Sequence, residues 1–177
     1  GMLHVAFARS QVARGRIVSI ETAAARDVPG VHAIYTAADL AAVPFTMHTF
    51  FMVPTSVHTP VLADGSVAYV GEPLALVIAD SRAIAEDAAA LVEVSYAEED
   101  PVVTLADAKV GLPVHPGCED NIAGQMGDDE IDDDLAAALD GATHRVRQRV
   151  IHQRISQSPM ETRGVLATRD GPEELTL

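Results

Sequence analysis

The chain has 177 residues, 48% of them hydrophobic, so it can bury the core of one domain or of one domain and the start of a second. Its formal net charge of −14, from 26 acidic residues against 12 Lys and Arg, argues against nucleic acid as a partner, because phosphate contacts need clustered cations. The single cysteine, Cys118, excludes an internal disulfide and an iron–sulfur cluster held by this chain, and no apolar run approaches the roughly 20 residues that cross a bilayer, so we expect a cytoplasmic protein without a membrane segment.

The start of the chain predicts strands and short helices in turn. Apolar side chains alternate with others in three predicted strands, at residues 3–10, 16–20 and 31–36. A short helix is predicted over residues 21–27, and Pro29 with Gly30 ends it. Thr36 and Asp39 approximate a capping box, which predicts a second short helix directly after the third strand.

Residues 43–60 predict a long loop, because three prolines interrupt a stretch rich in Phe and Met. Large apolar side chains are costly to leave in water, so this loop either folds back on its own core or docks against another domain or subunit. Phe50 and Phe51 are the candidate contact residues of the docking alternative.

The most distinctive local feature is the break Gly71-Glu72-Pro73 after Tyr69. Glycine permits a backbone bend and proline fixes the next φ, so the structural interpretation is a kink between two strands. The functional alternative makes Glu72 a general base, but the sequence supplies no partner side chain for it. We keep Tyr69, Gly71, Glu72 and Pro73 as candidate motif or interface residues.

A strand, a helix and a second strand follow this break and form the best-supported unit of the sequence. The apolar run at residues 74–79 predicts a strand buried on both faces, and residues 92–96 alternate as a strand. Ser81 predicts the start of the helix between them. The helix is expected to bury Ile84, Ala88, Leu91 and Val92. If the two strands are parallel, the unit is a right-handed crossover.

The rest of the chain changes in composition. Residues 101–131 gather Pro and Gly and predict a linker or wrapping arm. A helix is predicted over residues 132–139, followed by strands at residues 143–155, 165–168 and 175–177. The free edge after the last strand is expected to pair with another copy, which predicts a homo-oligomer.

Catalytic and metal-binding patterns are not found. The acidic run at residues 128–134 lacks the spacing of a calcium loop, and carboxylates at a helix start are favoured by the helix dipole. None of the seven histidines pairs with another at a spacing that would point two imidazoles at one ion. Arginines near residues 9–16 and 145–154 predict either solvated strand faces or a partner-binding surface. We assign no catalytic, cofactor-binding or metal-binding residue.

Short segments spread along nearly the whole chain carry a further signal, at residues 3–10, 16–20, 29–31, 36–40, 60–65, 67–73 and 85–96, then Gln153 and residues 158–165. Each is weak alone, but in this order and spacing they resemble the large subunits of molybdenum hydroxylases, the family of xanthine dehydrogenase, aldehyde oxidase and aerobic carbon monoxide dehydrogenase. The form of Pro159, Met160 and Glu161 looks most like the carbon monoxide dehydrogenase branch, and we keep these three as motif residues without an assigned role.

The resemblance implies an α+β fold. It places an α/β hammerhead domain at residues 2–100, a linker or wrapping arm at residues 101–131, and the helix and first strands of an incomplete molybdopterin-binding domain at residues 132–177. In the family, the cofactor loop, the active-site loop and the catalytic glutamate lie downstream of where this sequence stops. The resemblance therefore implies that this chain by itself binds no cofactor and is inactive.

For the complete enzyme, the resemblance implies an oxidoreductase in which molybdenum on molybdopterin cytosine dinucleotide hydroxylates or oxidises a small substrate. Electrons would leave through iron–sulfur and flavin subunits. We therefore expect the N-terminal scaffold and docking part of a large subunit, whose partners are the catalytic molybdenum domain and those two subunits. The alternatives are a free-standing binding or assembly module with the same fold, and an independent small enzyme that acts through Glu72.

Overall fold

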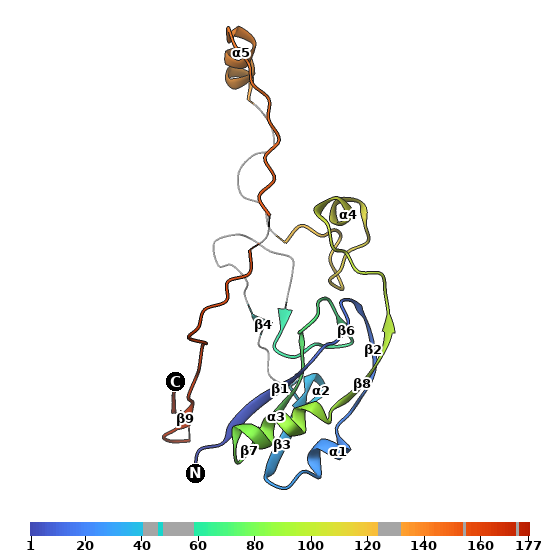
Figure 1. Cartoon of the computed structure of the whole chain (residues 1–177), viewed down its shortest axis with the longest axis vertical. Coiled ribbons are helices and arrows are strands. Elements are labelled where there is room, and N and C mark those ends of the chain that lie inside the picture. Colours follow the sequence, from blue (N-terminus) through green and yellow to red (C-terminus); the bar gives the residue numbers. More distant parts are fainter. Residues whose placement is uncertain (41–45, 48–58, 124–131, 154, 173) are drawn as a thin grey trace. The chain divides into compact units, whose positions relative to one another are not determined.

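The computed structural model describes residues 1–40, 46–47, 59–123, 132–153, 155–172 and 174–177. The chain forms two compact units, Gly1–Gly127 and Asp128–Leu177, whose helices and strands are labelled in Figure 1. Within the described ranges, no helix has both the length and the apolar character needed to cross a membrane.

The first unit contains a three-stranded antiparallel sheet in the order β1-β7-β3, whose strands are labelled in Figure 1. Its strands are β1 (His4–Arg9), β7 (Pro73–Ala79) and β3 (Val31–Thr36). The strands predicted at residues 3–10, 31–36 and 74–79 are confirmed. The prediction that the central strand is buried on both faces is wrong for one face, because Leu76 and Ile78 of β7 are only partly buried.

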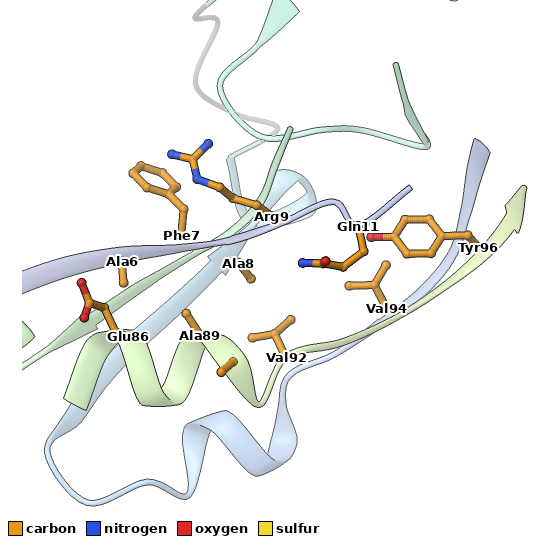
Figure 2. Close-up of a pocket in the computed structure, with 11 residues that line it drawn as sticks. Ala6, Phe7, Ala8, Arg9, Gln11, Glu86, Ala89, Val92, Val94 and Tyr96 are labelled. Carbon is orange, nitrogen blue, oxygen red and sulfur yellow. The ribbon is translucent and has the colours of Figure 1, made fainter. Parts of the chain in front are cut away.

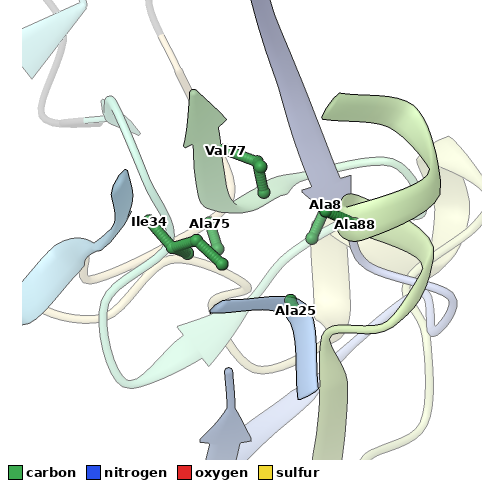
Figure 3. Packing of buried hydrophobic residues seen from close by; sticks show 6 residues of the cluster. All are labelled: Ala8, Ala25, Ile34, Ala75, Val77 and Ala88. Atoms are coloured by element: carbon green, nitrogen blue, oxygen red, sulfur yellow. The ribbon is translucent and has the colours of Figure 1, made fainter. Parts of the chain in front are cut away.

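Alanines make up most of the core beneath this first sheet. The buried cluster, drawn in Figure 3, consists of Ala8, Ala25, Ile34, Ala75, Val77 and Ala88. Its members come from all three strands and from two helices, α1 (Ala23–Arg26) and α3 (Arg82–Ala90). Small side chains at these positions let the helix backbone approach the sheet closely, so the core depends on close packing rather than on large side chains.

Helix α3 begins where the sequence predicts, because the side-chain oxygen of Ser81 accepts a hydrogen bond from the backbone N–H of Ile84 at 3.3 Å. Its fully buried residues are Ala85 and Ala88. The predicted apolar face is wrong at Leu91, which is 44% exposed. The helix ends at Ala90, so Leu91 takes the cap position instead of continuing the buried stripe.

A second three-stranded antiparallel sheet, in the order β6-β2-β8, belongs to the same unit. Its strands are β6 (Ser66–Val67), β2 (Gly15–Glu21) and β8 (Glu93–Glu98). Ala63, Val67 and Leu74 form its buried cluster, with Ile17 and Tyr96 packed against them. Because Leu74 lies on β7, this cluster links the second sheet to the first.

Helix α3 connects β7 of the first sheet with β8 of the second. The condition for a right-handed crossover, two parallel strands in one sheet, is not met, because β8 pairs antiparallel with β2 and not with β7. The physical reason is that β1 and β3 already occupy both edges of β7, so no edge is left for β8.

Helix α2 (Ala37–Leu40) starts directly after Thr36, where the sequence predicts it. Oδ2 of Asp39 accepts hydrogen bonds from the backbone N–H of Thr36 at 2.7 Å and from its hydroxyl at 2.9 Å. Both bonds lower the pKa of the Asp39 carboxyl, and the bond from the backbone N–H has the larger effect. The predicted loop that follows lies largely outside the described residues, with Phe50 and Phe51. Its two described pieces, β4 (Thr46–Met47) and β5 (Thr59–Pro60), pair antiparallel.

Helix α4 (Leu105–Val110) lies in the stretch that the sequence predicts as a linker or arm. Its start is a full capping box, in which the Thr104 hydroxyl accepts the N–H of Asp107 and the Asp107 carboxylate accepts the N–H of Thr104. The signal was present as Thr-x-x-Asp, but Pro and Gly nearby obscured it.

The second unit contains helix α5 (Asp133–Gly141) and a small ladder of β9 (Thr168–Arg169) with β10 (Leu175–Thr176). The predicted helix start is confirmed, since a side-chain oxygen of Asp132 accepts the N–H of Leu135 at 2.7 Å. The predicted strand at residues 143–155 is wrong for its described residues, which are in no strand. An alternating segment becomes a strand only with a pairing partner, and no described segment pairs with this one.

Candidate docking surface

The face of the first sheet opposite α3 is apolar and partly open to solvent. Side chains alternate across a strand, so Phe7 of β1 points away from the helix, as Figure 2 shows. The register sets Phe7 opposite Leu76 and Leu76 opposite Tyr35, which makes one row of three large side chains. Phe7 is 37% exposed and Tyr35 is 41% exposed. We call this surface the open face, formed by Val5, Phe7, Tyr35, Leu76 and Ile78.

Arg9 extends the open face at the end of β1. Its guanidinium carbon lies 5.2 Å from the centroid of the Phe7 ring, which is cation–π distance, and both side chains lie on one side of the strand in Figure 2. Nη1 of Arg9 also donates a hydrogen bond to the carbonyl oxygen of Gly71 at 2.8 Å. Arg9 thus connects the open face to the turn before β7.

That turn contains the break predicted at residues 69–73, and it is fixed to the residue after β1. The N–H of Ser10 donates to the carbonyl oxygen of Glu72 at 2.9 Å, and the N–H of Gly71 donates to the carbonyl oxygen of Ser10 at 2.8 Å. Gly71 has φ +90°, a conformation that favours glycine. The predicted kink is confirmed.

Tyr69 and Val70 lie at the tip of this turn and are 46% and 62% exposed. Burial of the phenol raises the pKa of Tyr69, the negative charge of Glu72 raises it further, and the positive charge of Arg9 acts in the opposite direction. Tyrosine and arginine are enriched among the residues that carry the binding energy of protein interfaces, and phenylalanine is enriched in interfaces generally.

A groove lies on the other side of β1, between that strand, α3 and β8 (Figure 2). Its volume is about 550 Å³. Most of its lining is apolar, with Ala6, Ala8, Ala89, Val92 and Val94 among the residues that form it. Arg9, Gln11, Glu86 and Tyr96 add polar groups to this lining.

The described candidate residues of the sequence belong to two different units. Tyr69, Gly71, Glu72 and Pro73 share the turn of the first unit. Pro159, Met160 and Glu161 belong to the second unit, where they lie exposed outside any helix or strand. The residues that sequence reasoning missed are Val5, Phe7 and Tyr35. The sequence shows that apolar side chains alternate in these strands. It does not show which side of the sheet α3 covers, so it does not predict which of these side chains stay exposed.

Comparison with known protein families agrees with this mixture of helices and small sheets. The family model described as the aldehyde oxidase and xanthine dehydrogenase a/b hammerhead domain matches residues 1–100. The chain belongs to this family. The hammerhead fold and the molybdenum hydroxylase resemblance predicted from the sequence are both confirmed.

Relatives of the hammerhead chain are much longer proteins. It is 35% identical to the nicotine 6-hydroxylase large subunit of Paenarthrobacter nicotinovorans over 98% of this chain and 21% of that protein. It is 34% identical to the carbon monoxide dehydrogenase large chain of Hydrogenophaga pseudoflava over 96% of this chain and 22% of that protein. The chain therefore spans about a fifth of the length of these relatives.

Two solved structures resemble this chain in both fold and sequence. Quinoline 2-oxidoreductase from Pseudomonas putida 86 matches with a TM-score of 0.55 and 41% identity, over 61% of this chain and 14% of that one. The Cu,Mo-CO dehydrogenase in its carbon monoxide reduced state matches with a TM-score of 0.55 and 39% identity, over 62% and 13%.

The lining of the groove beside β1 does not fit a molybdenum cofactor. A pterin dinucleotide needs many donors around a concave pocket, whereas the side chains lining the groove offer N–H donors only at Arg9 and Gln11. Among the described residues, no group of three His, Cys, Asp or Glu side chains is placed to hold a metal ion. We therefore derive no step of molybdenum chemistry from this chain.

Proposed function

We propose that this hammerhead chain is the N-terminal scaffold and docking part of a molybdenum hydroxylase large subunit. The observation that carries the proposal is the open face, because it is an apolar surface that is partly exposed. The chain spans about a fifth of the length of its relatives, so most of a large subunit lies outside it. Burial of apolar surface stabilises by about 25 cal/mol per Å², so a row of Phe7, Leu76 and Tyr35 favours a covering partner. The rest of a large subunit is such a partner.

The complete enzyme in this proposal is an oxidoreductase that uses molybdopterin cytosine dinucleotide, held outside this chain by the catalytic molybdenum domain. Iron–sulfur and flavin subunits receive the electrons. Support comes from relatives named as molybdenum enzymes and as subunits of complexes, such as the 6-hydroxypseudooxynicotine dehydrogenase complex subunit gamma. The single cysteine of the sequence supports the cytoplasm as the compartment. The outer strand edges, which pair with no other strand among the described residues, support a homo-oligomer.

Coexpression tests the proposal. The DNA that follows the coding sequence of this chain should encode the missing cofactor region, and that product should copurify with this chain in a one-to-one complex. The double variant Phe7→Ser, Tyr35→Ser should weaken the complex while the far-ultraviolet circular dichroism stays unchanged. Val18→Ser is the matched control, because Val18 is 57% exposed on β2 of the second sheet.

A free-standing assembly module is the alternative function. It predicts that no cofactor region is encoded nearby and that the open face binds some other protein. If the double variant Phe7→Ser, Tyr35→Ser copurifies with the cofactor region as well as the wild-type chain does, a role of the open face in docking is contradicted. The contact would then lie elsewhere.

A further inference from the structure

Glu72 is the one charged side chain that is buried among the described residues, with 5% of its surface exposed. The other carboxylates of the described residues are exposed, and water stabilises their charge. A buried carboxylate loses that solvation and normally has a cation beside it. Glu72 therefore needs an explanation that the proposed function does not supply.

Within the described part of the chain, only one of the two oxygens of the Glu72 carboxylate accepts a hydrogen bond. Oε2 accepts the backbone N–H of Ala68 at 2.6 Å. The ion pairs of the described residues are Arg14–Glu99, His32–Asp80, Arg82–Glu86 and Arg145–Asp140, so none involves Glu72. No described side-chain oxygen is both sealed from solvent and without a hydrogen bond, so Oε1 must face accessible space.

That space is a half-open pocket of about 240 Å³. It is lined by Pro60, Asp64, Ser66, Ala68, Glu72, His115 and Pro116. Pockets for drug-sized ligands start at about 300 Å³, so this one suits a small head group. Asp64 adds a second carboxylate at its exposed rim, and Ser66 and His115 add a hydroxyl and an imidazole. The two carboxylates favour a cation as the ligand.

We propose that this pocket binds a guanidinium group, with Glu72 as its main contact and Asp64 as a weaker one. A planar guanidinium presents several N–H donors in a fixed fork that matches carboxylate oxygens. Oε2 keeps its bond to Ala68, which holds the carboxylate in one orientation, and Oε1 accepts from the ligand. The source is either the arginine side chain of a protein or a free small guanidine compound, and the same chemistry recognises both.

The test uses the 177-residue chain and two probes. Methylguanidinium chloride represents the free compound, and the peptide Gly-Arg-Gly with blocked ends represents a protein side chain. Nitrogen-15 NMR follows each titration at constant ionic strength. The amide of Ala68 should shift saturably, because its N–H is bonded to the carboxylate that receives the ligand. Binding of the peptide alone identifies a protein source, and binding of both probes admits either.

Three variants sharpen the result. Glu72→Gln keeps the shape and an oxygen for the Ala68 N–H but removes the charge, and it should weaken binding about tenfold or more. Asp64→Asn, at an exposed residue, should weaken binding by less. Glu93→Gln, an exposed glutamate on β8, should leave the affinity unchanged.

The proposal is overturned if the Ala68 amide of the wild-type chain shows no saturable shift with either probe. It is also overturned if Glu72→Gln binds as tightly as wild type. If Glu72→Gln does not fold, the wild-type titration and Asp64→Asn still decide. None of these measurements involves the rest of a large subunit, so failure here and failure of the proposed docking function are distinguishable.

Discussion

Alanine at position 88 shows how little room the core beneath the first sheet has. Ala88 is fully buried and packs in one cluster with Ala8 and Val77 (Figure 3). Ala88→Leu should therefore lower the free energy of unfolding by about 1–3 kcal/mol, because the added atoms force the helix away from the sheet. Urea denaturation measures the change.

Ala83→Leu is the matched control, since Ala83 is on the exposed side of the same helix. It should change the stability by less than about 0.5 kcal/mol. Equal losses in the two variants would contradict the packing that places Ala88 between helix and sheet.

Tyr69 is a residue whose titration reports the charges around the turn. Its raised pKa means that the folded chain holds the phenol proton more tightly than the unfolded chain, for which 10.0 is the ordinary value. The free energy of unfolding should therefore fall as pH rises from about 10 through the folded pKa. NMR of the Tyr69 ring protons measures that pKa directly.

Two substitutions should move this pKa in opposite directions. Glu72→Gln should lower it, though not to 10.0, because burial is the largest cause and remains. Arg9→Gln should raise it, because the charge of Arg9 acts to lower it. A pKa that neither variant moves would show that Glu72 and Arg9 do not act on the phenol.

At the scale of elements, the pairing of β2 with β8 depends on the absence of a side chain at Gly15. A Cβ there would lie 2.9 Å from the carbonyl oxygen of Ala97 and 3.2 Å from the Cα of Glu98. Both neighbours are backbone, so the strands would have to separate. Gly15→Ala should lower the free energy of unfolding by about 1–3 kcal/mol, as measured by thermal or urea denaturation.

Gly141→Ala is the control for this prediction, because a Cβ at Gly141 meets nothing within 4 Å. It should be neutral, or stabilising by up to about 1 kcal/mol, since alanine restricts the unfolded chain. A Gly15→Ala variant as stable as this control would show that β2 and β8 are further apart than the structure has them.

For the whole molecule, we predict that the chain purified from a host supplied with molybdate contains no stoichiometric molybdenum and is colourless. The reason is the donor set, since the described residues present neither a pterin site nor three clustered metal ligands. Elemental analysis and a visible absorption spectrum measure both. Stoichiometric molybdenum would contradict the scaffold proposal, because its ligands would have to come from outside the groove beside β1 and from groups other than clustered His, Cys, Asp or Glu side chains of the described residues.

The predicted contact loop also belongs to this scale. Phe50 and Phe51 lie outside the described residues, so their role stays a prediction. The double variant Phe50→Ser, Phe51→Ser should weaken association with a partner while the fold persists, as circular dichroism and copurification would measure. Loss of the fold instead would place the two side chains in a core.

Local signals in the sequence determined most elements of the first unit and the family. Alternation located β1 and β3, Ser81 located the start of α3, and the order of short segments identified the hammerhead. Tertiary structure decided which strands pair, which residues α3 buries, and how Ser10 meets Glu72 across 62 positions of sequence. The open face and the buried Glu72 carboxylate both follow from those pairings. The physical reason is that caps and alternation act between near neighbours, whereas pairing and burial depend on the packing of distant segments.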